Sequence, residues 1–306
     1  MIKHLEQKEI DRIKWDKCMS ESPNACMFAY TWYLDIVCEG WAGLVLNDYE
    51  AVFPIARKSK FKISYIFQPF FTRYFGVFSH EKNPADVKEF LAAIPPEYKY
   101  MEFCLHESNE LTDSDFQIRE RKYQSLDLSP SLQEIQSSYS DNTKRSIKKA
   151  LKAGFILQNS ARPEVIVNLF RENKGAELEE FKPGDYQTLA RLMKEFSKQE
   201  NAETFCVRDQ ENNVCAAAFF MKNKDRFVYL KSGQSEAGRA SGAMHLLVDG
   251  MIRKHAGTNK ILDFGGSSVE TVARFYKSFG AKDCVYLQVK KDRLSRIAKL
   301  IRSLKS

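Results

Sequence analysis

A stretch near the C-terminal end, residues 262–282 (LDFGGSSVETVARFYKSFGAK), combines residue types that can do chemistry. Asp263 carries a carboxylate that can cap a helix or orient a substrate, and Tyr276 carries a phenol that can donate a proton. Gly265 and Gly266 have no side chains, so a ligand can approach the backbone closely there. Each feature also has a structural interpretation, a tight turn for the glycines and a buried core residue for the tyrosine.

The elements that must position this stretch are a strand, a glycine turn, a helix and a further strand. The apolar segment KILDF predicts a short buried strand, and CVYLQVKK predicts the strand that follows the helix. Apolar residues at helical spacing predict a helix over 268–279, with Tyr276 on its apolar face. Lys277 points elsewhere on that helix, toward solvent.

Length and composition indicate a globular chain of two domains. The 306 residues are 43% hydrophobic and 28% charged, and the longest apolar run, VCAAAFFM, is far too short to span a membrane. The N-terminus is charged throughout, so it does not read as a signal peptide. The seven cysteines form no CxxC pairs and their number is odd, which favours reduced thiols in a cytoplasmic protein. The five histidines show no ligand spacing, so we expect no metal.

Two basic segments account for part of the net charge of +7. In the first, NTKRSIKKALKAG at 142–154, Lys144 and Arg145 are candidates for binding a phosphate or carboxylate of a substrate, and a solvated helix face is the alternative. The second, within 292–306, predicts a basic C-terminal helix. We expect its apolar face to dock on the protein, and weak contact with an anionic membrane is the alternative interpretation.

The order of predicted elements occurs twice along the chain. In the second half, two helices (163–177 and 185–198) precede an antiparallel meander of three strands, a helix around Met244 to Met251, and the strand–helix–strand unit described above. The first half repeats this order more loosely. We therefore predict a domain over 1–130 and a domain over 131–306, with helix 131–153 linking them.

Four motifs make the chain resemble the GNAT superfamily of acyltransferases in its tandem form, similar to the Fem-type aminoacyltransferases and related acetyltransferase-like proteins. They are NTKRSIKKALKAGF, GRASGAMHLLVDGMI, LDFGGS and ARFYKSFGA, and they occur in the family's order. The resemblance implies an α/β (mixed α+β) fold of two tandem GNAT-like domains, each a mixed, mostly antiparallel sheet flanked by helices. It also implies that the sheet is splayed between its fourth and fifth strands, where an acyl thioester such as acetyl-CoA lies.

The same resemblance implies which residues bind the thioester. The family's Arg/Gln-x-x-Gly-x-Gly/Ala motif, which holds a pyrophosphate on the backbone at a helix start, matches here as far as Gly242, and its last small residue is replaced by Met244. The implied contacts come from the motif, the fourth strand and the glycine turn: Arg239, Ala240, Ser241, Gly242 and Ala243, the backbone of Lys231, Ser232 and Gly233, and Gly265 and Gly266.

The resemblance also gives Tyr276 a role. In the acetyltransferase branch a tyrosine at this position of the last helix donates a proton to the leaving thiolate. In the Fem branch a lysine stands there, whereas this chain has its lysine one position later, at Lys277. That difference favours the acetyltransferase-type interpretation. Asp263 or water is the candidate for a general base, and capping is the favoured alternative for Asp263.

The substrate-binding residues of the first half are predicted from an aromatic segment, YIFQPFFTRYFGVFS, which otherwise indicates core. Its polar interruptions Gln68, Thr72 and Arg73 are candidates for binding the acceptor, together with Lys144, Arg145 and Lys277. The acceptor is expected to be a small-molecule or peptide-like amine.

The sequence therefore predicts a GNAT-type N-acyltransferase that moves an acyl group, here acetyl, directly from a CoA thioester to an amine. One alternative is Fem-type transfer from aminoacyl-tRNA to a peptidoglycan precursor. A second is a degenerate module that binds a ligand or membrane without catalysis, which Met244 and the basic C-terminal helix would suit.

Overall fold

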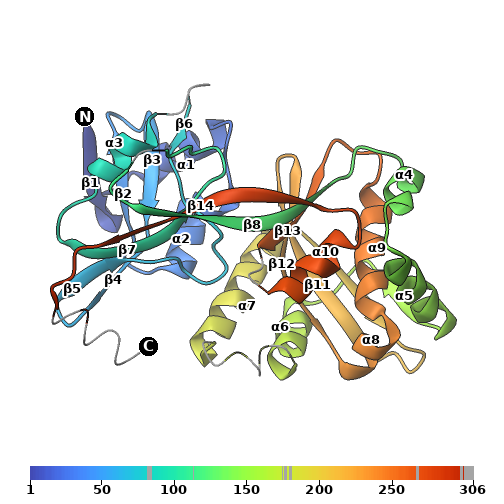
Figure 1. Cartoon of the computed structure of the whole chain (residues 1–306). Helices are drawn as coiled ribbons and strands as arrows, with labels where there is room; N and C mark the ends of the chain where they lie inside the picture. Colours follow the sequence, from blue (N-terminus) through green and yellow to red (C-terminus); the bar gives the residue numbers. More distant parts are fainter. Residues whose placement is uncertain are drawn as a thin grey trace. The chain divides into compact units, whose positions relative to one another are not determined.

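The chain folds into two compact units in a computed structural model (Figure 1). The structure describes residues 1–80, 85–112, 114–173, 175, 178, 181–266, 269–296 and 299. The first unit comprises residues 1–121 and 285–306, and the second comprises 122–284. These limits differ from the predicted ones because strand β14 (Lys282–Asp292) returns to the first unit, where it pairs antiparallel with β7 (Tyr98–Leu105).

The second unit is built on a mixed sheet with the strand order β8-β13-β12-β11-β10-β9. Strands β10, β11 and β12 form the predicted antiparallel meander, and β13 runs parallel to β12. The strands are β8 (Gln117–Asp127), β9 (Ile156–Gln158), β10 (Ala202–Arg208), β11 (Val214–Asn223), β12 (Arg226–Gln234) and β13 (Ile261–Gly266).

Helices cover both faces of this sheet (Figure 1). Phe219 of β11 contacts Phe196 of α7, whereas its neighbour Phe220 belongs to the core cluster beneath α9. Successive strand residues point to opposite faces, so α7 and α9 lie on opposite sides. The helices of this unit are α4 (Leu132–Ser137), α5 (Asp141–Lys152), α6 (Pro163–Glu172), α7 (Pro183–Lys198), α8 (Glu236–Ser241), α9 (Ala243–His255) and α10 (Glu270–Lys277).

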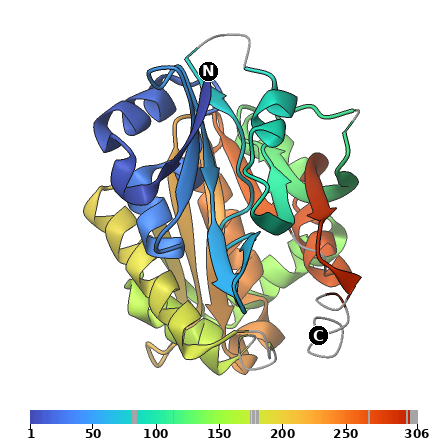
Figure 2. The same ribbon diagram turned by 90° about the vertical axis from the view of Figure 1, so that its left-hand side faces the viewer.

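The first unit repeats the theme with two groups of strands (Figure 2). One is the sheet β1-β2-β3-β6, and the other contains β4, β5, β7 and β14 as successive neighbours. A Cβ on Gly43 of β2 would meet the ring of Trp15 in α1, while Phe53 of β3 stacks on Phe90 of α3, so α1 and α3 cover opposite faces. The remaining elements are β1 (Ile2–Glu6), α1 (Arg12–Glu21), α2 (Thr31–Val37), β2 (Ala42–Leu46), β3 (Ala51–Ile55), β4 (Arg57–Lys60), β5 (Ile63–Ile66), β6 (Phe78–Ser79) and α3 (Val87–Ala92), with 3-10 turns at Gln7–Glu9 and Met27–Ala29.

The predicted linking helix over 131–153 is wrong in two respects. It is two helices, because Ser131 and Ser140 each cap a new helix start through the side-chain oxygen. Both helices belong to the second unit, and the chain passes between the units within β8. The mixed sheets flanked by helices confirm the predicted fold class.

The predicted C-terminal helix lies mostly outside the described residues, which include only 292–296 and 299 of the segment 292–306. No helix in the described part of the chain has the length and apolar character needed to cross a membrane. All seven cysteines are free thiols, and six of them are buried.

Candidate functional site

The parallel strands β12 and β13 pair along only part of their length. Their register runs from Arg226 opposite Ile261 to Val228 opposite Asp263 and then stops, although β12 continues to Gln234. From Tyr229 onward, no described residue pairs with β12 on the β13 side. This divergence is the splay that the resemblance implied between the fourth and fifth strands of the domain.

A register shift in β12 lies at the point of divergence. Phe219 of β11 faces Lys231, while Phe220 faces Tyr229, so Leu230 is an extra residue without an opposite partner. Backbone groups of alternate strand residues point to opposite edges. Past Tyr229, one alternate set of N–H and C=O groups of β12 is therefore directed into the splay rather than toward β11.

The helix that follows β12 is broken at Gly242. Helix α8 ends there with Gly242 in the left-handed conformation (φ +82°), and α9 begins at Ala243 without any side chain capping its N–H groups. A Cβ on Gly242 would lie 2.6 Å from the backbone oxygen of Ser146 in α5. Glycine is required there by the backbone angle and by the close approach of α5, and the uncapped start of a 13-residue helix can receive an anion.

The side chain of Met244 points into the core. Met244 is 7% exposed, and the Tyr229 hydroxyl lies 3.4 Å from its sulfur. Burial raises the pKa of Tyr229 to about 12. Met244 departs from the family motif, but its side chain fills space in the core under α9. The start of the helix therefore stays open.

Tyr276 lies at the end of the splay, in an aromatic cluster. Its ring stacks on Phe264 of β13 and contacts Tyr229 of β12 edge-on, with centroids 4.7 and 5.9 Å apart. The residue is 9% exposed. The packing agrees with both interpretations of Tyr276: the ring is part of the core, and it contacts both of the strands that diverge.

The carboxylate of Asp263 is held by two neighbours. It is fully buried, its Oδ2 lies 3.2 Å from Nη1 of Arg226, and its Oδ1 accepts the N–H of Gly265 at 2.9 Å. Asp263 therefore fixes the turn at the end of β13 rather than capping α10, whose N-cap is Val269. In this arrangement the carboxylate has a structural task, and its role as a base stays a prediction.

The two adjacent glycines form an irregularity in β13. Gly265 has φ +75°, a conformation that glycine adopts without strain, and Gly266 is opposite Tyr123 of β8 after a register shift. They let β13 turn away from the line of β12, which is how they contribute to the splay.

The predicted contacts on β12 and α8 have different surroundings. The Lys231 ammonium lies 3.8 Å from the ring centroid of Phe170 in α6, and Gly233 is buried where a Cβ would come within 2.4 Å of the Phe170 backbone nitrogen. Gly233 is therefore required by the packing of α6. Ser232 is half-buried on β12; on α8, Arg239 and Ala240 are exposed and Ser241 is half-buried.

The basic helix α5 reaches the start of α9 through one residue. Lys149 donates from Nζ to the backbone oxygen of Ala240 at 2.8 Å, next to the break at Gly242. Lys144 and Arg145 are exposed on the same helix, and Lys144 contacts the backbone oxygen of Ser137. The structure brings Lys149, rather than Lys144, to the predicted anion site.

The other predicted substrate contacts lie elsewhere. Lys277 forms an ion pair with Asp283 at 2.7 Å, which occupies its ammonium at the surface. Gln68, Thr72 and Arg73 belong to the first unit. The Gln68 side chain accepts the N–H of Cys104 and donates to the backbone oxygen of Thr72, so it ties the loop after β5 to β7. The part of these residues in binding an acceptor remains a prediction.

Sequence reasoning missed two residues of this region. Arg226 is the ion-pair partner of Asp263. The signal that could have predicted this pair is that both residues occur near the start of adjacent strands. His245 stands in the first turn of α9, its ring 4.9 Å from that of Phe275, and burial lowers its pKa. An imidazole that is neutral at physiological pH can accept a proton, but one histidine in an amphipathic helix gave no signal.

The described residues form no metal cluster at the splay. Within the described residues, no group of three or more His, Cys, Asp or Glu side chains could hold a metal ion. Two open hollows of about 390 and 320 Å³ lie in the first unit and share Asp115, Lys291 and Arg293 in their lining. They contain none of the predicted site residues.

Comparison with known families finds a match within the second unit. Residues 137–278 match the family described as "Acetyltransferase (GNAT) domain". This segment contains the diverging strands, the break at Gly242 and Tyr276. The resemblance to the GNAT superfamily of acyltransferases is thereby confirmed, and no curated protein sequence matches the chain.

Solved structures show the same fold over nearly the whole chain. FemX is 14% identical with a TM-score of 0.59, covering 93% of this chain and 96% of its own. L-PGS from Bacillus licheniformis is 14% identical (TM-score 0.56, 95% of both chains), and a tandem GNAT protein from the clavulanic acid biosynthesis pathway is 10% identical (TM-score 0.52, 96% and 99%). At these identities the likeness concerns the fold alone.

Proposed function

We propose that the protein is an N-acyltransferase that moves an acetyl group from acetyl-CoA to an amine. The observation that carries the proposal is the divergence of β12 from β13 at Tyr229, with backbone groups of β12 on one side and Tyr276 on the other. An acyl thioester that lies in this gap can be bound by the backbone alone, without a covalent intermediate on the enzyme.

The start of α9 supports a donor that carries phosphate groups. Its N–H groups have no side-chain cap, and the positive charges of Lys149 and Arg239 belong to the elements that meet there. A pyrophosphate is favoured by the free N–H groups, by the helix dipole and by the two cations. CoA supplies such a pyrophosphate together with a reactive thioester.

Different residues of the chain would assist different steps of the reaction. N–H groups of β12 beyond Tyr229 stabilise the negative charge that develops on the carbonyl oxygen while the amine attacks. The carbon–sulfur bond then breaks, and the hydroxyl of Tyr276 donates its proton to the departing sulfur. The amine loses its own proton to solvent or to a nearby base, for which the half-buried imidazole of His245 is a candidate.

The surroundings of Lys277 disfavour the Fem-type alternative. A lysine that stabilises charge during aminoacyl transfer needs its ammonium near the reacting groups, whereas Lys277 is paired with Asp283. The residue at the position facing the strands is Tyr276. An acetyltransferase-type mechanism uses the hydroxyl of Tyr276, which is the side chain that packs against the diverging strands.

Calorimetric titration with acetyl-CoA tests the proposal, and free CoA and an uncharged thioester such as acetylpantetheine serve as probes of the two parts of the donor. Saturable binding of acetyl-CoA and CoA, with weak binding of acetylpantetheine, is expected. Absence of acetyl-CoA binding together with affinity for aminoacyl-tRNA would instead support the Fem-type transfer. Absence of both would support a module without catalytic activity.

A further inference from the structure

Strands β4 and β5 form a hairpin, Arg57–Ile66, which we name the basic hairpin (lower left in Figure 1). The strands pair antiparallel from Arg57 opposite Ile66 to Lys60 opposite Ile63. Strand β7 runs beside β5 only from Ser64 onward, and β4 is the last strand of its sheet. The tip of the hairpin therefore extends past the neighbouring strand.

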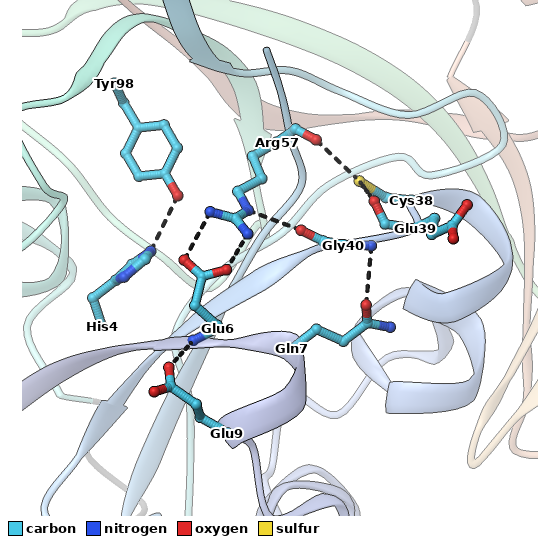
Figure 3. Close-up of polar contacts among 9 residues, drawn as sticks. All are labelled: His4, Glu6, Gln7, Glu9, Cys38, Glu39, Gly40, Arg57 and Tyr98. Atoms are coloured by element: carbon cyan, nitrogen blue, oxygen red, sulfur yellow. Dashed lines mark hydrogen bonds and ion pairs between the residues drawn. The ribbon is translucent and has the colours of Figure 1, made fainter.

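The base of the basic hairpin is fixed to the first unit through Arg57 (Figure 3). The guanidinium of Arg57 binds the carboxylate of Glu6 and donates from Nε to the backbone oxygen of Gly40 at 2.8 Å. The thiol of Cys38 lies 3.5 Å from the backbone oxygen of Arg57. These contacts hold the base and neutralise its charge, so the free charges of the hairpin lie nearer to its tip.

The outward face of the basic hairpin combines cations with apolar groups. Lys58 is opposite Tyr65 and Lys60 is opposite Ile63, and residues that face each other in an antiparallel pair share one side. The Lys58 ammonium also lies 4.4 Å from the ring centroid of Phe67. Lys58, Lys60 and Lys62 are exposed, and none forms an ion pair with any residue that the structure describes.

The sequence around the hairpin keeps its charge uncompensated. Residues 51–80 contain no Asp or Glu, and they contain five Lys or Arg. In a chain where 40 of 306 residues are acidic, an acid-free stretch of this length makes the local field positive. The favoured partner of this surface is therefore anionic.

The tip of the basic hairpin is an exposed aromatic residue. Phe61 is 69% exposed, and both Phe61 and Lys62 have positive φ, 53° and 61°, as a two-residue type I′ turn requires. Asn-Gly is the sequence that this turn favours, and neither Phe nor Lys relieves the strain of the left-handed conformation. The Lys60 ammonium lies 5.8 Å from the Phe61 ring centroid, and the ring still remains largely exposed. A turn that departs from its favoured residues to present such a side chain is characteristic of a functional surface.

We propose that the basic hairpin binds the surface of an anionic phospholipid membrane. Phe61 enters the boundary between headgroups and acyl chains, while Lys58, Lys60 and Lys62 pair with lipid phosphates. The ladder reaches to Lys60 and Ile63, so the turn brings few unpaired backbone groups to the membrane. This proposal does not depend on the acyl-transfer function.

Another exposed apolar residue of the first unit provides a matched comparison. Ile13 of α1 is 84% exposed and, like Phe61, lies between two cations. Those cations are neutralised, because Arg12 is paired with Asp35 and Lys14 with Asp48. Exposure alone is common on protein surfaces, and the basic hairpin differs in that no described acidic residue forms an ion pair with its three lysines.

Co-sedimentation with vesicles tests the proposal, with phosphatidylcholine alone compared with an equal mixture of phosphatidylglycerol and phosphatidylcholine. The wild-type protein should bind the mixed vesicles, and added salt should weaken the binding. Changing Lys58, Lys60 and Lys62 together to Gln should weaken it roughly 100-fold, at about fivefold for each lysine. Phe61→Asn, which suits the left-handed turn, should weaken it about tenfold.

Two control variants test whether binding depends on the position of the changed residues in the hairpin or only on the loss of charge and apolar surface. Ile13→Asn removes an equally exposed apolar side chain, and the triple change of Lys3, Lys8 and Lys88 to Gln removes the same charge from exposed sites of the same unit. Both should bind as the wild type does, and no variant should melt below the wild type, since Phe61→Asn relieves strain in the turn. The proposal is overturned if the triple control variant weakens binding as much as the triple hairpin variant. It is also overturned if the wild type binds vesicles with and without phosphatidylglycerol equally. Binding to single-stranded RNA that depends on the hairpin, without vesicle binding, also overturns it.

Discussion

The ring of Phe264 stacks on the ring of Tyr276 with centroids 4.7 Å apart and planes inclined by 21°. Phe264 belongs to β13 and Tyr276 to α10, so the stack fixes the last helix of the domain on the strand that diverges from β12. Stacked aromatic rings hold each other's orientation. The stack with Phe264 therefore holds the Tyr276 hydroxyl at the end of the splay.

Replacing Tyr276 by Phe separates the chemical role of the residue from its packing role. The change keeps the stack and removes only the hydroxyl. If the hydroxyl donates a proton to the departing thiolate, turnover should fall roughly 10- to 100-fold with little change in KM, measured by following release of free CoA thiol. If the residue is only core, activity should persist while the free energy of unfolding falls by about 1 kcal/mol.

Tyr229→Phe is the matched control for this variant. Tyr229 lies in the same aromatic cluster, and its hydroxyl contacts Ser232 and the sulfur of Met244, which is a weak acceptor. Its loss should leave turnover within about twofold of the wild type. An equal loss of turnover in the two variants would mean that general packing, rather than proton donation, governs the rate.

The buried pair of Asp263 and Arg226 should contribute to stability. Asp263→Asn leaves the guanidinium of Arg226, which is 18% exposed, without its counter-charge and should lower the free energy of unfolding by about 3 kcal/mol, measured by urea denaturation. Arg226→Gln should cost a similar amount. A base function for Asp263 predicts something different, namely a large loss of turnover in Asp263→Asn at unchanged stability.

Gly242 should tolerate no side chain. Gly242→Ala places a Cβ 2.6 Å from the Ser146 backbone oxygen at φ +82°, so we expect the free energy of unfolding to fall by roughly 2–3 kcal/mol. Gly257 is the control, because its φ is +77° and nothing lies within 4 Å of the added atom. Gly257→Ala should cost only the backbone strain, about 1 kcal/mol. Equal costs would show that α5 yields to the added methyl group.

Lys149 should contribute to donor binding more than its neighbour does. Lys149 contacts Ala240 beside the start of α9, while Lys148 is exposed on the same helix. Lys149→Gln should weaken CoA binding about fivefold in calorimetry, as expected for the loss of one phosphate contact of about 1 kcal/mol, and Lys148→Gln should not. The reverse order would move the anion site away from Gly242.

Hydrophobic periodicity predicted the second unit well. The meander β10 to β12, the helices α6, α7, α9 and α10, and the strand β13 all occur where alternation or helical spacing indicated them. The failures occur at boundaries. In the first unit, β3 ends at Ile55 and β4 begins at Arg57 in another sheet, and periodicity carries no information on which sheet a strand joins.

The candidate site could be predicted only as far as its motifs reach. Tyr276 and Gly242 follow from local patterns, and the structure gives each a position at the diverging strands or the helix break. The pairing of Asp263 with Arg226, the inward turn of Met244 and the approach of Lys149 to Ala240 depend on tertiary packing over 15 to 91 residues of sequence. No local pattern encodes which side chains meet over such separations.

The carboxylate of Glu203 on β10 should make stability depend on acid pH. It lies 3.0 Å from the Lys254 ammonium and 2.9 Å from His255 Nε2, with Lys222 at 3.7 Å. Burial opposes ionisation of Glu203, but its hydrogen bonds with His255 and Lys254 outweigh that cost and lower its pKa to about 2. A carboxyl whose pKa is lower in the folded state stabilises the fold above its unfolded pKa and loses that effect as the pH falls toward the folded value.

Glu203→Gln tests this dependence through urea denaturation at a series of pH values. Near neutral pH the variant should be less stable than the wild type by on the order of 1–2 kcal/mol, since partial exposure weakens the interaction. The difference should shrink as the pH falls from the ordinary value of 4.5 toward about 2, where the wild-type carboxyl becomes protonated as well. Glu172→Gln, at an exposed site of α6, is the control and should show no such convergence. A stability difference for Glu203→Gln that stays constant over this range would mean that Lys254, His255 and Lys222 do not hold the carboxylate in its charged form.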